Sequence, residues 1–168
     1  MKTIKILDDS KDVCQRVAQI LKKQEHLFIL GKGPGESIAK EGALKIKELS
    51  NLHAEGFCSG EFKHGPLAMI DTDAKTPFIL VIMDDQYFDD MVYALNQVKG
   101  RQATTIVITD CPEKISKDLV DELIPVPHCG YLSCLMGVFP LQLISYYVAL
   151  ARGCDPDRPR NLAKQITT

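Results

Sequence analysis

The sequence predicts an α/β fold, a three-layer αβα sandwich in which helices cover both faces of a five-stranded parallel sheet. Short, continuous apolar runs recur along the chain, as is typical of strands buried on both faces. They alternate with segments of helical periodicity, which is the arrangement of parallel α/β domains. The 168 residues suit one domain with a sizeable core. We therefore expect a single domain over residues 1–168, ending in a tail at 154–168.

The first elements follow from apolar spacing. Residues 8–25 should form a helix on the sheet, with Ser10 as its N-cap, and the run 27–31 should form a buried strand. A glycine turn at 31–35 follows, and free backbone N–H groups before a helix attract anions. Its sequence, GKGPG, is not a nucleotide-binding motif, and Pro34 lacks an N–H. We interpret the turn as a tight connection between strand and helix.

The alternation continues to residue 126. The helix that carries Ile38 and Leu52 is followed by a second strand within 54–62, centred on 56–61. The remaining expected elements are a turn with a short helical segment at 65–70, strands at 78–83, 104–109 and 122–126, and helices at 88–98 and 113–120.

Residues 131–151 carry no charge, and an uncharged run of this length is a formal candidate for a membrane span. Pro140, Gln142 and the pair Tyr146 and Tyr147 make it too polar for a lone span, and we predict no membrane association. A helix buried on nearly all sides explains the run better. Such a helix would also meet a partner domain or a second subunit, so we expect self-association, most simply a homodimer.

Composition excludes several functions. The net charge is −2 and no basic run occurs, so nucleic acid is not an expected partner. The six cysteines show neither a CxxC pair nor metal-ligand spacing, and we expect reduced thiols, no metal and no cofactor. Residues 1–11 are polar and charged, unlike a signal peptide, so a cytoplasmic protein is expected.

An acid–base–acid stripe marks the helix after the glycine turn. Glu41, Lys45 and Glu48 are spaced i, i+4 and i+7, along the margin of the apolar face. The simpler interpretation is a set of helix salt bridges worth a few tenths of a kcal/mol each. However, Lys45 falls within the apolar arc, and a partly buried Lys–Glu cluster can shift proton affinities toward neutrality. Downstream, His64 stands in a rigid HGP turn suited to a general acid or base.

Three long, irregular motifs carry a family resemblance. EGALKIKELSNLHAE, GEFKHGPLAMID and PLQLISYYVALARGCDPDRPRNLAK together resemble the second sugar-isomerase (SIS) domain of the glutamine–fructose-6-phosphate aminotransferases, the glucosamine-6-phosphate synthases. The likeness covers nearly the whole chain. It implies a flavodoxin-like SIS domain with strand order 2-1-3-4-5, and sugar phosphates such as fructose-6-phosphate and glucosamine-6-phosphate as ligands.

The resemblance also implies roles for individual residues. Glu48 would shuttle a proton between C1 and C2 of the sugar, and His64 would open the fructose ring from a neighbouring subunit. Lys164, in the RNLAK tail, would form a Schiff base with the open-chain ketose. Glu41 and Lys45 match residues that surround Glu48 and would tune its proton affinity. As a proton shuttle, Glu48 should lie at the carboxyl edge of the sheet, near a cavity that Lys164 can reach.

Two departures from the family limit the predicted activity. The serine-rich loop with which the family's first SIS domain grips phosphate is absent from this chain, as is the N-terminal cysteine of its glutaminase domain. The sequence therefore predicts the isomerase half of a synthase, inactive without the first SIS and glutaminase domains. The alternative is a non-catalytic phosphosugar-binding or regulatory SIS module.

Overall fold

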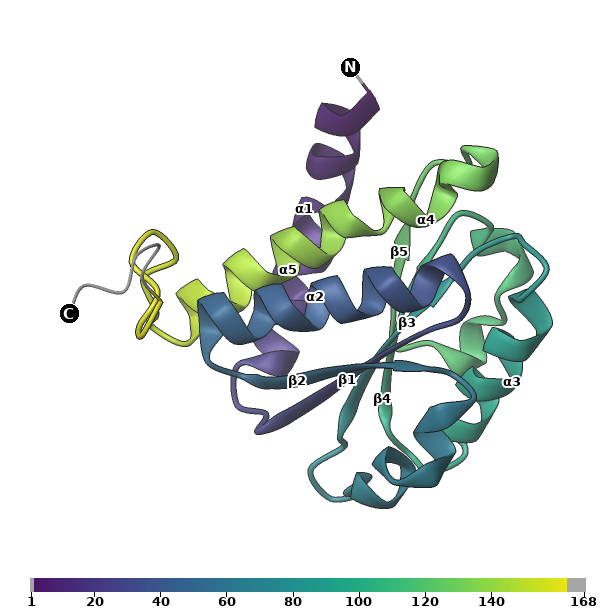
Figure 1. Cartoon of the computed structure of the whole chain (residues 1–168), viewed down its shortest axis with the longest axis horizontal. Helices are drawn as coiled ribbons and strands as arrows, with labels where there is room; N and C mark the ends of the chain where they lie inside the picture. The colour runs from purple at the N-terminus through teal and green to yellow at the C-terminus, as the bar shows by residue number, and fades with distance from the viewer. Residues whose placement is uncertain (1, 163–168) are drawn as a thin grey trace.

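The computed structural model describes residues 2–162, residues 2–6 by their backbone alone, and its centre is one parallel sheet (Figure 1). The strands are ordered β2-β1-β3-β4-β5, and each neighbouring pair is parallel. This order confirms the expected flavodoxin-like topology. The strands span β1 His26–Gly31, β2 His53–Cys58, β3 Pro77–Ile82, β4 Thr104–Thr109 and β5 Glu122–Pro125.

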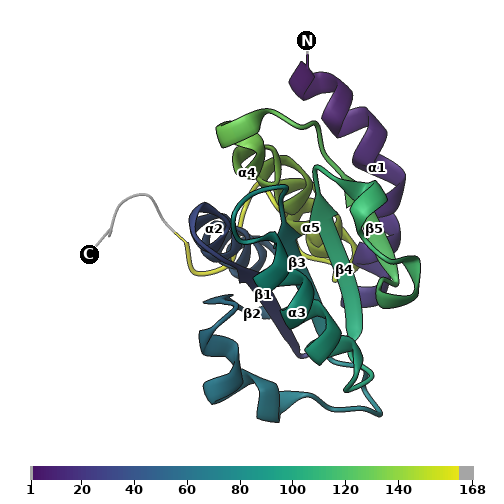
Figure 2. The same ribbon diagram turned by 90° about the vertical axis from the view of Figure 1, so that its right-hand side faces the viewer.

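Helices cover both faces of the sheet, which confirms the three-layer sandwich (Figure 2). One face carries α1 Lys2–Leu21, α2 Pro34–Ser50, α4 Ser133–Met136 and α5 Val138–Ala151, and the other carries α3 Phe88–Lys99. Short 3-10 turns complete the connections at η1 Glu61–His64, η2 Pro66–Met69, η3 Pro112–Lys114, η4 Lys117–Leu119 and η5 Gly130–Leu132.

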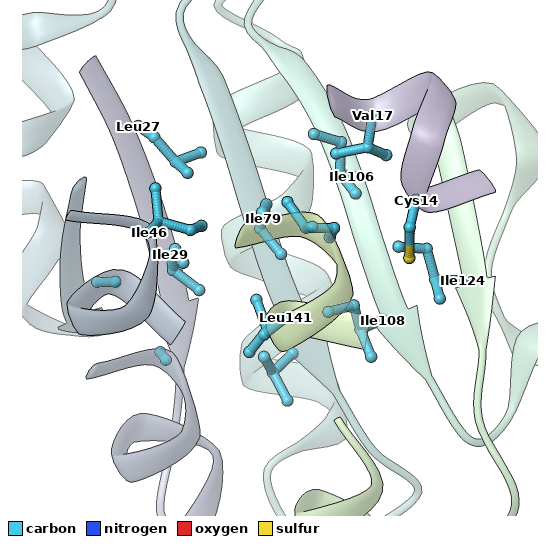
Figure 3. Close-up of a cluster of buried hydrophobic side chains, with 14 of the residues drawn as sticks. Cys14, Val17, Leu27, Ile29, Ile46, Ile79, Ile106, Ile108, Ile124 and Leu141 are labelled. Atoms are coloured by element: carbon cyan, nitrogen blue, oxygen red, sulfur yellow. The ribbon is translucent and has the colours of Figure 1, made fainter. Parts of the chain in front are cut away.

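The strands are apolar throughout because each supplies side chains to two cores. In β1, Ile29 belongs to the cluster beneath α1, α2 and α5, whereas Leu30 belongs to the cluster beneath α3. Successive strand side chains point to opposite faces, so a strand covered on both sides has no polar face. Figure 3 shows the first cluster, in which Ile46 of α2 lies beside Ile29 of β1 and Leu141 of α5 lies near Ile79 of β3.

Glycines let α2 lie close to its neighbours. A Cβ atom at Gly42 would stand 2.7 Å from a methyl carbon of Leu141, and one at Gly56 of β2 would stand 2.6 Å from the backbone of Lys40. Real side chains do not approach so closely. These contacts fix the position of α2 between β2 and α5.

Several elements differ from the sequence-based prediction, and in place of the helix expected at 113–120 the chain forms the 3-10 turns η3 and η4. Helix α1 begins at Lys2, so Ser10 lies within the helix and is not its N-cap. Strand β2 runs from His53 to Cys58, about three residues earlier than predicted, and the chain then turns into η1. Phe62 of η1 is fully buried under the second core, which explains its apolar character without a strand.

The uncharged residues 131–151 fall in η5, α4 and α5. By length and composition alone, Gly130–Ala151 could cross a membrane. It is divided at Gly137, and α5 packs along both α1 and α2. The single chain leaves apolar side chains of this stretch exposed: Tyr131, Leu132, Leu135, Tyr146 and Leu150. Burial on nearly all sides was expected together with a partner, and it stays a prediction.

Candidate active site

The acid–base–acid stripe predicted from spacing is present on α2. Lys45 Nζ lies 2.7 Å from Glu48 Oε2 and 3.8 Å from Glu41 Oε1. The side chains of Glu41, Lys45 and Glu48 are 41%, 33% and 29% exposed, so the group is partly buried as expected. One ammonium group thus holds two carboxylates on one face of the helix.

Local sequence explains where α2 begins and ends. Gly33 takes a positive φ of 56°, and Pro34 follows at the first helical position, where a missing N–H costs nothing. At the other end, Asn51 adopts the left-handed conformation and donates its N–H to the carbonyl of Lys47. Glu48 therefore stands in the last turn of the helix.

The charge on Lys45 is firmly retained. Its hydrogen bond to Glu48 raises the pKa of Lys45, and the smaller effect of burial, which lowers it, does not cancel this gain. The expected shift of this lysine toward neutrality is therefore wrong. Lys45 acts as a fixed cation that orients Glu48 and is unsuited to accept protons near neutral pH.

Glu48 lies at the amino edge of the sheet, so its predicted place at the carboxyl edge is wrong. The helix starts where β1 ends and must return to the edge where the parallel strand β2 begins, only three residues after Ser50. The first turn of α2 is therefore at the carboxyl edge and the last turn at the amino edge.

His64 is not brought to Glu48 within one chain. It is an exposed residue at the end of η1, beyond the carboxyl end of β2. The six residues of β2 lie between the two positions, which corresponds to about 20 Å of strand. This separation agrees with a His64 supplied by another subunit, a role that stays a prediction.

Lys164 lies outside the described residues, but the segment that leads toward it is anchored beside the last turn of α2. Arg152 donates to the carbonyl oxygens of Ser50, Lys22 and Gln24 at 3.0, 3.0 and 3.1 Å. The thiol of Cys154 also contacts the Ser50 carbonyl, at 3.6 Å. These contacts were not predicted from the sequence, because nothing there distinguishes Arg152 from any other charged residue after a helix.

A cavity of about 460 Å³ separates α2 from this segment. It is lined on one side by Leu49, Ser50 and Asn51 and on the other by residues that include Arg158 and Arg160. Glu48 directly precedes the first of these in the chain. Glu48 itself is not among the residues that line this cavity, so a cavity within reach of both Glu48 and Lys164 stays a prediction.

The glycine turn before α2 has the geometry of a tight connection. A Cβ atom at Gly31 would lie 2.1 Å from the carbonyl oxygen of Gly35, and one at Gly33 would meet the ring of Tyr87. The lysine of the turn, Lys32, is paired with Asp90. Within the described part of the chain, no group of three or more metal-ligating side chains occurs, and the cysteines are free thiols.

The strand order and the two helical layers define a doubly wound α/β domain of the sugar-isomerase type, with a charged stripe on the helix after β1. The chain belongs to the SIS domain family, whose sequence pattern matches residues 20–152. This confirms the resemblance found in the motifs.

Individual similar proteins show which members of the SIS family this chain resembles. The glutamine–fructose-6-phosphate aminotransferases [isomerizing] of Shewanella oneidensis and a Synechocystis strain are 41% and 39% identical over 157 and 163 residues. These matches cover 93% and 96% of this chain but only 26% of each relative, so the chain spans about a quarter of their length. The C-terminal domain of the Francisella tularensis glucosamine-fructose-6-phosphate aminotransferase superposes with a TM-score of 0.86 at 32% identity, over 94% of this chain and 44% of that one.

Proposed function

We propose that this chain is the isomerase-half SIS domain of a glutamine–fructose-6-phosphate aminotransferase, and that it contributes to the conversion of fructose-6-phosphate to glucosamine-6-phosphate. The observation that carries the proposal is the 2.7 Å contact between Lys45 Nζ and Glu48 Oε2 in the charged stripe on α2. The similarity to aminotransferases over more than nine-tenths of the chain supports it.

In the proposed reaction, His64 from a neighbouring subunit opens the sugar ring and exposes the C2 ketone. The Lys164 amine adds to C2 and, with loss of water, forms a Schiff base. Ammonia, supplied by the glutaminase part of the whole enzyme, then displaces the Lys164 amine from C2 and leaves an imine at C2. The Glu48 carboxylate removes a proton from C1 and returns it to C2, which yields the C1 aldehyde and the C2 amine without an external oxidant. Lys45 holds that carboxylate in one orientation, and Glu41 helps to keep Lys45 in place.

Self-association in the cytoplasm is part of the proposal. The apolar edge formed by Tyr131, Leu132 and Leu135 is exposed in the single chain, and contiguous exposed apolar surface is typical of interfaces. The distance between His64 and Glu48 along β2 also calls for a second subunit if both act on one sugar. The alternative of a regulatory phosphosugar-binding module is favoured by GKGPG in place of a serine-rich loop.

Calorimetry can separate these functions. The purified chain is titrated with fructose-6-phosphate and with glucosamine-6-phosphate, alone and after addition of the remaining part of a related aminotransferase. The isomerase-half proposal predicts weak or no binding alone, with binding and turnover restored in the mixture. Tight binding by the chain alone, with no turnover in the mixture, would instead establish the regulatory module.

A further inference from the structure

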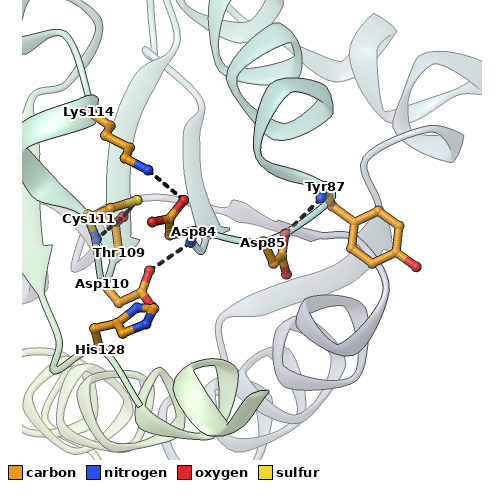
Figure 4. Close-up of polar contacts among 8 residues, drawn as sticks. All are labelled: Asp84, Asp85, Tyr87, Thr109, Asp110, Cys111, Lys114 and His128. Atoms are coloured by element: carbon orange, nitrogen blue, oxygen red, sulfur yellow. Dashed lines mark hydrogen bonds and ion pairs between the residues drawn. The ribbon is translucent and has the colours of Figure 1, made fainter. Parts of the chain in front are cut away.

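A second polar site lies at the carboxyl edge of the sheet, opposite the edge that carries Glu48. Asp110 directly follows β4, and His128 lies three residues beyond β5. His128 Nδ1 is 2.8 Å from Asp110 Oδ2 (Figure 4). The Asp110 side chain is fully buried, whereas 57% of the His128 side chain is exposed.

The surroundings of Asp110 keep it ionised. Burial acts to raise the pKa of Asp110, but hydrogen bonds from the Ser133 hydroxyl, the Asp84 N–H and His128 outweigh it and hold the pKa below its ordinary value. An ionised carboxylate can only accept, so Nδ1 of His128 carries the hydrogen. In the neutral imidazole, Nε2 is then an acceptor fixed in direction.

His128, held by Asp110 behind it, lines a cavity of about 410 Å³, within the range of small-molecule sites. Its wall includes Pro34 at the start of α2 and Asp84 to Tyr87 after β3. Strands β1 and β3 are neighbours whose following helices cover opposite faces, so the cavity lies at the point where the strand order reverses. In open parallel sheets, ligands bind in this position.

The fully charged side chains that line this cavity are both carboxylates, and its neutral polar side chains can donate or accept: Gln86, Tyr87, Tyr131 and Ser133. Asp84 and Asp85 line it together with His128, and the nearby cation Lys114 is already bound to Asp84 at 2.7 Å. Burial, and then the charges of Asp85 and Asp110, raise the pKa of the Cys134 thiol to about 11, so this thiol stays neutral beside them. A phosphate group is therefore a poor match for this cavity, and a ligand rich in hydrogen-bond donors is a good one.

The floor of the cavity is apolar. Met83 and Cys134 line it and are almost fully buried. An apolar floor beneath acceptors suits a sugar ring, which presents C–H groups on its face and hydroxyl groups at its rim.

We propose that this cavity is a second ligand site, for an unphosphorylated polyhydroxyl ligand that bears an ammonium group, and that His128 Nε2 accepts a hydrogen bond from it. Asp110 is a positioning residue that fixes the imidazole. The proposal is independent of the function assigned to Glu48, because the two sites lie at opposite edges of the sheet.

The test uses D-glucosamine as a cationic probe and inorganic phosphate as an anionic one. Long-range proton–nitrogen NMR spectra of the four histidines are recorded during each titration of the chain. D-glucosamine should shift the His128 Nε2 resonance saturably and leave His53, at the amino edge, unmoved. Phosphate should leave His128 unmoved.

Calorimetry with variants completes the test. His128→Gln should weaken D-glucosamine binding at least tenfold, while the control His53→Gln should bind as the unmodified chain does. His128 is exposed, so its replacement should leave the fold intact, which a thermal melt verifies. The proposal is overturned if D-glucosamine produces no saturable shift, if its binding survives His128→Gln, or if phosphate binds more tightly than D-glucosamine.

Discussion

Lys45 Nζ lies 2.7 Å from Glu48 Oε2, within a single helical turn and with both side chains about one-third exposed. At that exposure, such a pair adds only about 0.3–0.5 kcal/mol to stability. The role proposed for this pair is to orient the Glu48 carboxylate, and its contribution to the stability of α2 is small.

The close contact between α2 and α5 should be sensitive to one added methyl group. Gly42→Ala places a Cβ atom 2.7 Å from the buried Leu141, and such overpacking costs about 1–3 kcal/mol. The higher helix propensity of alanine offsets at most about 1 kcal/mol. Urea unfolding should show a lower midpoint. Gly35→Ala is the matched control in the same helix, since its Cβ would meet only ordinary contacts near 3.6 Å. Equal midpoints for the two variants would contradict the described packing.

Acid should destabilise the fold through Asp110. Its pKa is lowered in the folded chain, so the folded state binds fewer protons than the unfolded state. This stability is present above about pH 4, the ordinary range of an aspartate, and is lost as pH falls toward the folded pKa. Asp110→Asn should lower the melting temperature at pH 7, and the deficit should shrink on acidification. The exposed Asp118→Asn should match the unmodified chain at every pH, and a pH-independent Asp110→Asn deficit would refute the assignment.

The apolar edge of η5 and α4 should mediate self-association. Leu135→Glu places a charge on a half-exposed position within this edge, so light scattering should show a monomer where the unmodified chain forms a dimer. The matched control is Tyr93→Glu on α3, which is equally exposed on the other face of the sheet. A monomeric unmodified chain at high concentration would mean that this edge is not the interface.

The sheet was predictable because its strands are apolar on both faces, and PFILVI at β3 is the clearest case. Strand β2 was placed too late, since HAEGFC has little apolar signal and Gly56 is required by the nearby Lys40 backbone, a contact that only the packed structure reveals. Similarly, the start of α1 could not be found from Ser10, which is a good N-cap in isolation.

The candidate site was predictable in part. Helical spacing alone brings Lys45 to Glu48, because i and i+3 are neighbours on any helix. The edge of the sheet on which Glu48 falls depends on the direction of α2, which periodicity does not show. Asp110 and His128 are 18 residues apart and follow different strands, so no local pattern joins them. Only the strand order brings them together.

The role of Glu48 as a proton shuttle is tested by the rate of proton exchange at C1 of fructose-6-phosphate in an aminotransferase that carries this chain as its isomerase half. Glu48→Gln keeps size and hydrogen bonding but removes the base, and it should slow isomerisation by about two to four orders of magnitude with almost no change in melting temperature. Glu36→Gln, which breaks the Glu36–Lys40 pair on the same helix, should leave the rate unchanged. A Glu48→Gln enzyme that exchanges at the normal rate, or one that loses its fold, would show that the carboxylate is structural.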